Sequence, residues 1–184
     1  ITWLTLSLLM VRNIRDRVHE TSRQCRTHPG IHQLDGFMNI IEQSATTLRQ
    51  LISTKKISPL EVLDACIDQI KRTDPEINAF TVTCVDEARA DAKRVEAQIM
   101  AGEDLGLLAG LPLAIKDMSL TKGMRTTFGS LIYENHIPDH DDLVVEFLRE
   151  EGAVIYGKTN TTEFGAGNNT TNAVFGDRKS TRLN

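Results

Sequence analysis

From residue 45 to residue 156, amphipathic helical patterns alternate with short apolar segments that are rich in β-branched residues. The helical patterns cover residues 45–52, 58–73, 86–100 and 141–151, and the apolar segments cover residues 79–82, 113–115 and 153–156. Helices that alternate with short buried strands are typical of α/β proteins, in which the helices pack against a sheet. The sequence therefore predicts an α/β fold.

Local signals mark where two of these helices begin and end. Residues 58–61 (Ser-Pro-Leu-Glu) have the pattern of a capping box with proline at the first helical position, which predicts a helix start. Because proline rarely continues a helix, we expect Pro75 to end this helix near Thr73. A later helix is predicted to begin at Asp141–Asp142 and to end at Gly152. Its expected inward side chains are Leu143, Val144, Phe147 and Leu148.

Charge and cysteine content narrow the classes of function. The chain of 184 residues has a formal net charge of −4, which gives no support for direct binding of nucleic acid. Cys25, Cys66 and Cys84 are odd in number and widely spaced, which fits neither a disulfide framework nor a zinc site. Cys66 falls on the apolar side of a predicted helix, where cysteine behaves as a small hydrophobic residue. We therefore expect a reduced, cytoplasmic protein without a metal site.

Residues 1–37 lack the organised pattern of the rest of the chain. Ile1–Val11 form an apolar run that is too short to span a bilayer. Basic residues follow this run, whereas a signal peptide would carry them first. Two interpretations stay open: a clipped membrane anchor, or upstream or linker sequence ahead of a start at Met38. The organised domain is predicted to cover residues 38–176, and no association with a membrane is expected.

Two motif-like patterns are better explained as structure. Gly152–Thr159 matches the phosphate-loop pattern. However, the residues between its glycines are predicted to form a strand, so their amide groups would be used in the sheet and could not bind phosphate. His136 and His140 are four residues apart, but Pro138 between them argues against a shared helical face. A metal site is therefore not expected there.

Lys116 is the main candidate for catalysis. It follows the apolar strand 113–115 and precedes Asp117, which predicts a charged side chain at the end of a buried element. Burial penalises an ammonium group, and a neutral lysine is a usable general base. From the spacing alone, a structural salt bridge with Asp117 or another acid explains this lysine equally well.

Several segments, in order along the chain, are similar to the landmarks of amidase-signature enzymes. Leu108–Asp117 resembles the segment that carries the catalytic lysine of that family. The other matching segments are Ser58–Pro59, Asn78–Phe80, Thr126–Ser130, Glu151–Asn160 and Glu163–Asn168. An ordered set of motifs is far more specific than any one of them. The resemblance covers residues 45–176 and implies the N-terminal part of the amidase-signature fold, an incomplete mixed sheet flanked by helices.

The resemblance also implies a mechanism. In this family a lysine takes a proton, through a bridging serine, from a second serine that attacks the amide carbonyl. Lys116 matches the lysine, whereas both serines and the oxyanion donors are expected beyond Gly176. Thr159 and Asn160 are expected to support the site through hydrogen bonds, and Lys158 is interpreted as structural. The resemblance implies no metal and no cofactor.

Residues 177–184 depart from the family pattern. They read Asp-Arg-Lys-Ser-Thr-Arg-Leu-Asn and resemble translated adapter sequence. We therefore expect a foreign tail and do not assign Ser180 as a nucleophile. The chain by itself is expected to hydrolyse no amide.

Three functions fit the resemblance. An amidase that hydrolyses a carboxylic amide to an acid and ammonia or an amine is favoured, because Thr161–Asn169 resembles stand-alone amidases. The alternative is the A subunit of glutamyl/aspartyl-tRNA amidotransferase, because Thr121–Thr127 resembles that protein. The third is an inactive remnant that serves as a binding module. The expected partners are a small-molecule amide substrate and, in a full-length protein, a second copy in a homodimer.

Overall fold

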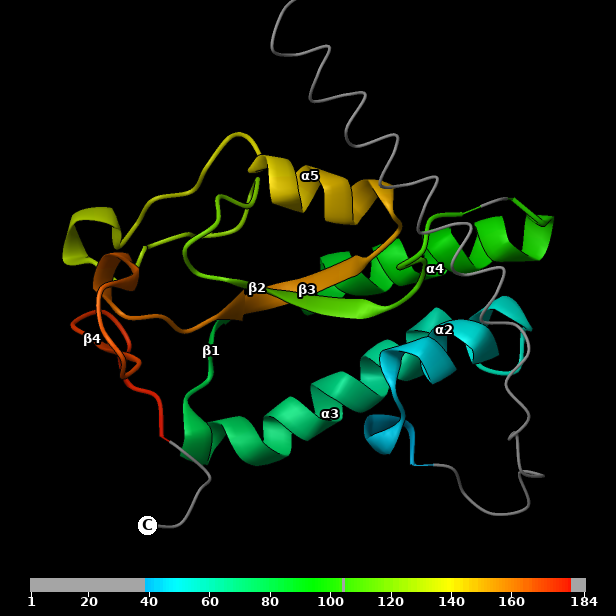
Figure 1. Cartoon of the computed structure of the whole chain (residues 1–184), viewed down its shortest axis with the longest axis horizontal. Helices are drawn as coiled ribbons and strands as arrows, with labels where there is room; N and C mark the ends of the chain where they lie inside the picture. The colour runs from blue at the N-terminus through cyan, green and yellow to red at the C-terminus, as the bar shows by residue number, and fades with distance from the viewer. Residues whose placement is uncertain (1–38, 104, 180–184) are drawn as a thin grey trace, which may run out of the picture. The chain divides into compact units, whose positions relative to one another are not determined.

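The structure, a computed structural model, describes residues 39–103 and 105–179. The predictions for residues 1–37 and for Ser180 lie outside this part of the chain. In chain order, the elements are η2 (Ile40–Glu42), α2 (Ala45–Ser53), α3 (Pro59–Ile77), β1 (Phe80–Thr83), α4 (Val85–Ala101), β2 (Pro112–Lys116), η3 (Leu131–Tyr133), α5 (Leu143–Glu150), β3 (Val154–Thr159), η4 (Glu163–Gly165), β4 (Thr171–Asn172) and β5 (Gly176–Asp177) (Figure 1).

A sheet with the strand order β1-β3-β2 forms the centre of the described unit. β2 runs parallel to β3, whereas β1 runs antiparallel to β3 along its other edge. A separate small ladder pairs β4 with β5. The mixed sheet with its flanking helices confirms the predicted fold class.

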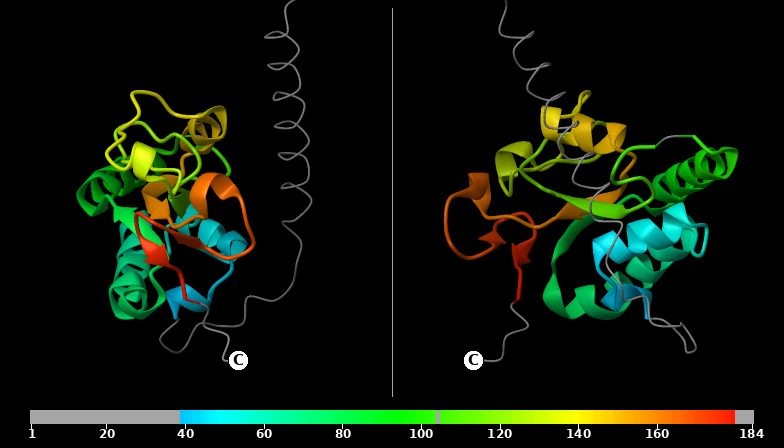
Figure 2. Two further views of the ribbon diagram at one scale, coloured as in Figure 1. Left: turned by 90° about the vertical axis from the view of Figure 1, so that its left-hand side faces the viewer. Right: turned by 45° about the vertical axis from the view of Figure 1, so that its right-hand side comes forward.

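Helices cover both faces of this sheet (Figures 1 and 2). On one face, α3 and α4 pack against β3. The buried side chains of that cluster are Leu63, Ile67, Ala88, Ala92 and Val154. On the opposite face, α5 packs against β2 and β3. The buried side chains of that second cluster are Ile115, Met124, Val145 and Ile155. Val154 and Ile155 are consecutive in β3 and therefore point to opposite faces, which gives each cluster one residue of β3.

The start of α3 confirms the predicted capping box. Ser58 Oγ accepts a hydrogen bond from the Glu61 amide at 3.0 Å, and a Glu61 carboxylate oxygen accepts one from the Ser58 amide at 2.8 Å. Pro59 occupies the first helical turn, where its missing N–H costs nothing. The sequence pattern therefore determines this boundary locally.

The predicted end of α3 near Thr73 is wrong, because the helix continues through Pro75. Asp74 explains the additional turn. Its carbonyl accepts a hydrogen bond from the Asn78 amide, and its carboxylate accepts one from the Ala79 amide at 2.7 Å. Bonds that close the end of the helix thus offset the bond that proline cannot donate.

The inward face of α5 also differs from the prediction. Leu143 and Val144 expose 77% and 55% of their surface, whereas Val145 is fully buried. The other two predicted inward residues are half-buried. Asp142 is the N-cap residue, but its carboxylate accepts a hydrogen bond from the Leu120 amide rather than from α5 itself. We attribute the rotation of this short helix to that contact with the preceding loop.

The phosphate-loop-like segment Gly152–Thr159 has the structure of a strand. Residues 154–159 of this segment form β3, and Gly152 precedes the strand with a left-handed φ of +82°. The Val154 amide donates to the carbonyl of Leu111 next to β2. The predicted strand is confirmed, and the segment has none of the loop geometry that phosphate binding requires.

β3 contains a one-residue irregularity that decides where its second half faces. The register with β2 shifts between Leu113 and Ala114, which leaves Tyr156 as an extra residue on β3. In a regular strand, Lys158 would share a face with Val154. Lys158 instead donates hydrogen bonds to the loop that follows β2. Met124 of this loop packs in the cluster under α5.

The last described residues contact the body of the unit. The Arg178 amide donates to the carbonyl of Thr170, and the Lys179 amide donates to the carbonyl of Ile77. These contacts do not define where the domain ends, so the boundaries at residues 38 and 176 stay predictions, as does the foreign origin of residues 177–184. Among the described helices, none is long and apolar enough to cross a membrane.

Candidate functional site

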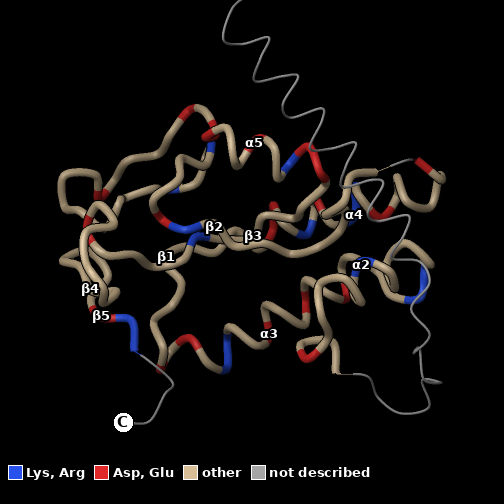
Figure 3. Tube along the Cα trace, viewed as in Figure 1, with Lys and Arg blue, Asp and Glu red and all other residues tan. Residues whose placement is uncertain are grey.

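The carboxyl ends of the parallel strands β2 and β3 bring two lysines to neighbouring positions. Lys116 is the last residue of β2 and pairs with Thr159, whereas Lys158 pairs with Ile115 one step earlier. Figure 3 shows basic positions where these two strands end side by side. Because ligands of α/β sheets bind beyond the carboxyl ends of the strands, this edge is the candidate site.

Lys116 is exposed in the described chain, and its burial in a full-length protein stays a prediction. The alternative of a salt bridge with Asp117 is not seen either, because none of the ion pairs among the described residues involves Lys116. Its backbone is firmly held: the Asp117 amide donates to the Thr159 carbonyl at 2.9 Å, and the Ser119 amide donates to the Lys116 carbonyl at 3.1 Å.

Lys158 is the buried lysine of the pair, with 0% of its surface exposed. Its Nζ donates hydrogen bonds to the carbonyl of Ser119, to Thr121 Oγ1 at 3.0 Å and to Thr126 Oγ1 at 2.9 Å. These acceptors match the donors of an ammonium group, which is therefore satisfied although it is buried. We call these four residues, Lys158, Ser119, Thr121 and Thr126, the Lys158 clamp.

Asp117 is the buried acid beside the clamp, also with 0% of its surface exposed. Its carboxylate accepts hydrogen bonds from the Thr127 hydroxyl at 2.6 Å and from the Thr127 amide at 3.2 Å. Thr126 and Thr127 are consecutive, so of two neighbouring hydroxyl groups one accepts a hydrogen bond from Lys158 and the other donates one to Asp117. The loop of residues 117–127 is thus folded around two buried charges.

Burial shifts the pKa of both groups toward the neutral form. Desolvation lowers the pKa of Lys158 from 10.5 to about 8, and the nearby charge of Asp117 partly opposes this shift. Desolvation raises the pKa of Asp117, while the hydrogen bonds from Thr127 and the charge of Lys158 act in the opposite direction. Both shifts show that the fold places these charges where water would solvate them better.

The acidic start of α5 holds the same loop from a second side. Asp142 Oδ2 accepts a hydrogen bond from the Leu120 amide at 2.7 Å, and Asp141 Oδ1 accepts one from the Lys122 amide at 2.6 Å. The other Asp141 oxygen pairs with Arg149 at 2.9 Å. These two acids, which we predicted as helix caps, therefore fix the loop that follows Lys116.

Asn160 and Thr159 connect β3 to other parts of the unit. Asn160 is buried; its Nδ2 donates to the Asn78 carbonyl at 3.3 Å, and its Oδ1 accepts from Asn172 at 2.7 Å. These bonds tie the end of β3 to the end of α3 and to β4. Thr159 contributes its carbonyl to the Asp117 amide. The two residues thus stabilise the edge that carries Lys116, and their part in catalysis stays a prediction.

An aromatic cluster that sequence reasoning missed lies near the same loop. The rings of Phe128, Tyr133 and Phe164 have centroids 5.1 to 6.4 Å apart. Phe128 and Phe164 have left-handed φ angles of +54° and +47°, which are costly for residues with a Cβ atom. A Cβ atom on Gly165 would lie 3.3 Å from Met118, which places the cluster beside the loop after Lys116. The two phenylalanines are far apart in sequence, and no local pattern announces a left-handed φ.

Potential metal ligands do not gather in the described part of the chain. No group of three or more His, Cys, Asp or Glu side chains could hold a metal ion there. His140 instead pairs with Asp139 at 2.7 Å, and this exposed hydrogen bond raises the pKa of His140. The ring of His136 contacts Tyr133.

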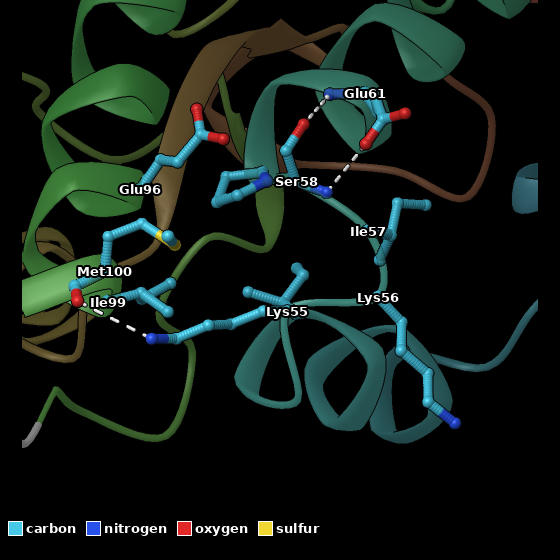
Figure 4. Close-up of a pocket in the computed structure, with 10 residues that line it drawn as sticks. Lys55, Lys56, Ile57, Ser58, Glu61, Glu96, Ile99 and Met100 are labelled. Carbon is cyan, nitrogen blue, oxygen red and sulfur yellow. Dashed lines mark hydrogen bonds between the residues drawn. The ribbon is translucent and has the colours of Figure 1, made fainter. Parts of the chain in front are cut away.

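A small cavity of about 170 Å³ lies where α2, α3 and α4 meet (Figure 4). Two charged residues of its lining have local partners: Glu61 completes the capping box, and Lys55 Nζ donates to the Met100 carbonyl at 3.5 Å. Pro59, which also lines the cavity, lies against Gly110 just before β2. The cavity is therefore near the start of β2 and does not belong to the candidate site at its end.

Curated relatives share sequence with most of this chain. The A subunit of glutamyl-tRNA(Gln) amidotransferase from Acidothermus cellulolyticus is 44% identical over 138 residues, which cover 75% of this chain and 27% of that protein. The chain therefore spans about a quarter of the length of such relatives.

Solved structures share the fold. A bacterial aryl acylamidase of the amidase-signature family is 33% identical with a TM-score of 0.68, over 73% of this chain and 28% of that one. Fatty acid amide hydrolase, at 24% identity, shares the fold with a TM-score of 0.72 over 76% of this chain and 25% of that one. A sequence model of the amidase family matches residues 61–181. With more than half of its residues matched by that model, this chain belongs to the amidase family.

Proposed function

We propose that this chain is the N-terminal part of a longer amidase, here called the full-length protein, that hydrolyses a carboxylic amide. Membership of the amidase family supports the reaction class. The observation that carries the proposal is the position of Lys116. It lies in the segment that resembles the family's lysine motif, and it ends β2 with its backbone hydrogen-bonded to the next turn.

In the proposed reaction, Lys116 is the general base. It accepts the proton of the attacking serine through a bridging serine, and the serine oxygen forms a bond to the amide carbonyl carbon. The carbon–nitrogen bond then breaks, and the leaving nitrogen takes up the proton. Water releases the acid from the serine ester. Both serines belong to the larger part of the full-length protein, which would also cover the exposed side chain of Lys116.

The test is turnover of a simple aliphatic amide by variants of the full-length protein. Lys116→Ala is expected to lower kcat by about 10²–10⁴-fold, because general-base catalysis contributes roughly that much. Lys116→Arg is expected to be nearly as inactive, because a guanidinium stays protonated. Lys122→Arg, an exposed lysine of the following loop, is the matched control and should keep wild-type turnover. Near wild-type activity in a folded Lys116→Arg variant would remove Lys116 from the mechanism.

A second candidate function is the A subunit of a tRNA-dependent amidotransferase. The 44% identity to the A subunit of glutamyl-tRNA(Gln) amidotransferase favours it. A stand-alone amidase releases ammonia from aliphatic amides without help, whereas the amidotransferase protein is expected to need a companion that binds tRNA. Ammonia release that depends on a companion and charged tRNA would select this second function.

The remaining parts of the proposal concern the setting of the protein. We propose a small-molecule amide substrate, a cytoplasmic location, no direct contact with nucleic acid and a homodimer of the full-length protein. An inactive remnant that serves as a binding module is the outcome if the folded full-length protein turns over no amide with or without a companion.

A further inference from the structure

The Lys158 clamp reaches Lys116 through two hydrogen bonds. The Lys158 ammonium donates to the Ser119 carbonyl, and the Ser119 amide donates to the Lys116 carbonyl at 3.1 Å. Asp117 lies between Lys116 and Ser119 in sequence, and its buried carboxylate accepts hydrogen bonds from Thr127. The backbone that carries the exposed lysine is therefore connected through Ser119 to a buried ammonium group.

Stability alone does not account for this arrangement. Lys158, Asp117, Thr121 and Thr126 are all fully buried. Removing charges from water is costly, and apolar residues of similar volume often fill such a space with equal or better stability. A buried polar network that is fully hydrogen-bonded offers a single, rigid geometry instead. The position of the clamp, directly after Lys116, indicates what that geometry serves.

We propose that Lys158 is a positioning residue, which holds the loop of residues 117–127 so that Lys116 keeps the orientation required for amide hydrolysis. This inference rests on the proposed function and assigns Lys158 no contact with the substrate. It differs from the interpretation of Lys158 as a structural residue, because a structural lysine would contribute to folding but not to kcat in the folded enzyme.

The first experiment measures amide hydrogen exchange in the full-length protein and in Lys158→Met, which keeps the length of the side chain but removes its donors. The amides of residues 118–127 are expected to exchange at least about tenfold faster in the variant, because the opening of a loop that has lost its anchoring bonds becomes easier. α3 and α4 are expected to keep their protection. Unchanged exchange in residues 118–127 overturns the proposal, whatever the activity.

The second experiment separates kcat from KM for the same variant on a simple amide. A loss of kcat of about 10–10²-fold with KM within about twofold is expected, because small misplacements of a catalytic group cost that much in rate. Faster exchange with unchanged kcat overturns the positioning role. A raised KM with unchanged kcat overturns it as well, since it would indicate a role in substrate binding.

A second variant covers the case in which Lys158→Met does not fold. The double variant Thr121→Val/Thr126→Val keeps Lys158 but removes its two hydroxyl acceptors. Thr161→Val is the matched control, because Thr161 Oγ1 is buried without a hydrogen-bond partner in the described chain. The double variant is expected to show the same faster exchange and lower kcat, and the control neither. Equal effects in both overturn the proposal.

Failure of the proposed function remains distinguishable from failure of this inference. If the folded wild-type protein hydrolyses no amide, or if Lys116→Ala keeps full activity, the proposed function is wrong, and the positioning role in amide hydrolysis fails with it. The exchange experiment does not depend on catalysis, so it still decides whether Lys158 anchors residues 118–127.

Discussion

The two halves of β3 lie in opposite environments. Val154 and Ile155, at its start, are buried among the aliphatic side chains of the two clusters that join the sheet to its helices. Lys158, near its end, is equally buried but among a carbonyl and two hydroxyl groups. The first half stabilises the fold by removing apolar surface from water. The second half buries charge, which costs free energy unless every partner is in place.

Depth of burial does not by itself indicate the purpose of a region. The apolar half would tolerate exchange of one aliphatic residue for another of similar size. The polar half depends on matched donors and acceptors, so the loss of one partner leaves another buried group unsatisfied. This polar half lies directly beside Lys116, where the proposed chemistry requires a fixed geometry.

The largest expected effect on stability comes from breaking the polar half. Lys158→Met removes a nearby positive charge that opposes the desolvation of the buried Asp117 carboxylate, and it removes the ammonium donor from Thr121 Oγ1 and Thr126 Oγ1. We expect a decrease of about 4 kcal/mol in the free energy of unfolding, because a buried carboxylate loses a nearby opposite charge and two buried hydroxyl groups lose a donor. Urea denaturation of the full-length protein measures it. Adding Asp117→Asn should recover part of the loss, and a double variant no more stable than Lys158→Met would contradict the coupling of the two charges.

A somewhat smaller effect is expected in the apolar half. Leu63→Ala leaves a cavity between α3, α4 and Val154, and we expect a loss of about 3 kcal/mol by the same denaturation measurement. In contrast to Lys158→Met, kcat of the folded enzyme should stay within about twofold of wild type, because a buried aliphatic contact on the far face does not hold the loop after Lys116. A large loss of kcat in this variant would show that the two halves are not functionally distinct.

The pH dependence of stability also distinguishes the polar half from the apolar half. The pKa of Lys158 is about 8 in the folded state and 10.5 as its ordinary value. Between these values the unfolded chain binds more protons than the folded chain, so the contribution of Lys158 to the free energy of unfolding rises with pH, by at most about 1.4 kcal/mol per pH unit. Below pH 8 both states bind the proton, and the contribution no longer changes. Urea denaturation from pH 7 to pH 10 should show this rise in wild type but not in Lys158→Met; parallel curves would contradict it.

The smallest expected effect concerns a hydroxyl that has no partner. Thr161 Oγ1 is the buried side-chain oxygen of the described residues for which no hydrogen bond is found. Thr161→Val removes it at nearly constant volume, so we expect no loss of stability and a gain of up to about 1 kcal/mol. Thermal unfolding of the full-length protein tests this. A clear loss of stability would place a hydrogen-bond partner for this hydroxyl in the rest of the full-length protein.

Local signals account for the parts of the fold that were predicted correctly. The capping box at Ser58 and Glu61 and the β-branched run that becomes β3 depend on neighbouring residues only. The prediction of the end of α3 was wrong because the Asp74 side chain closes the helix beyond Pro75. A general rule about proline does not take such a side-chain bond into account. The prediction of the inward face of α5 was wrong, and we attribute this to the hydrogen bond between Asp142 and Leu120, which lies far from α5 in sequence.

By itself, the sequence determined the α/β class, the order of the elements and the motif that identifies Lys116 as the candidate base. Only the tertiary structure decided which lysine is buried. Lys116 lies at the end of its strand and is exposed, whereas an extra residue at Tyr156 turns Lys158 into a loop from another part of the chain. Burial of a side chain depends on what packs over it from elsewhere in the molecule, and strand periodicity alone does not carry that information.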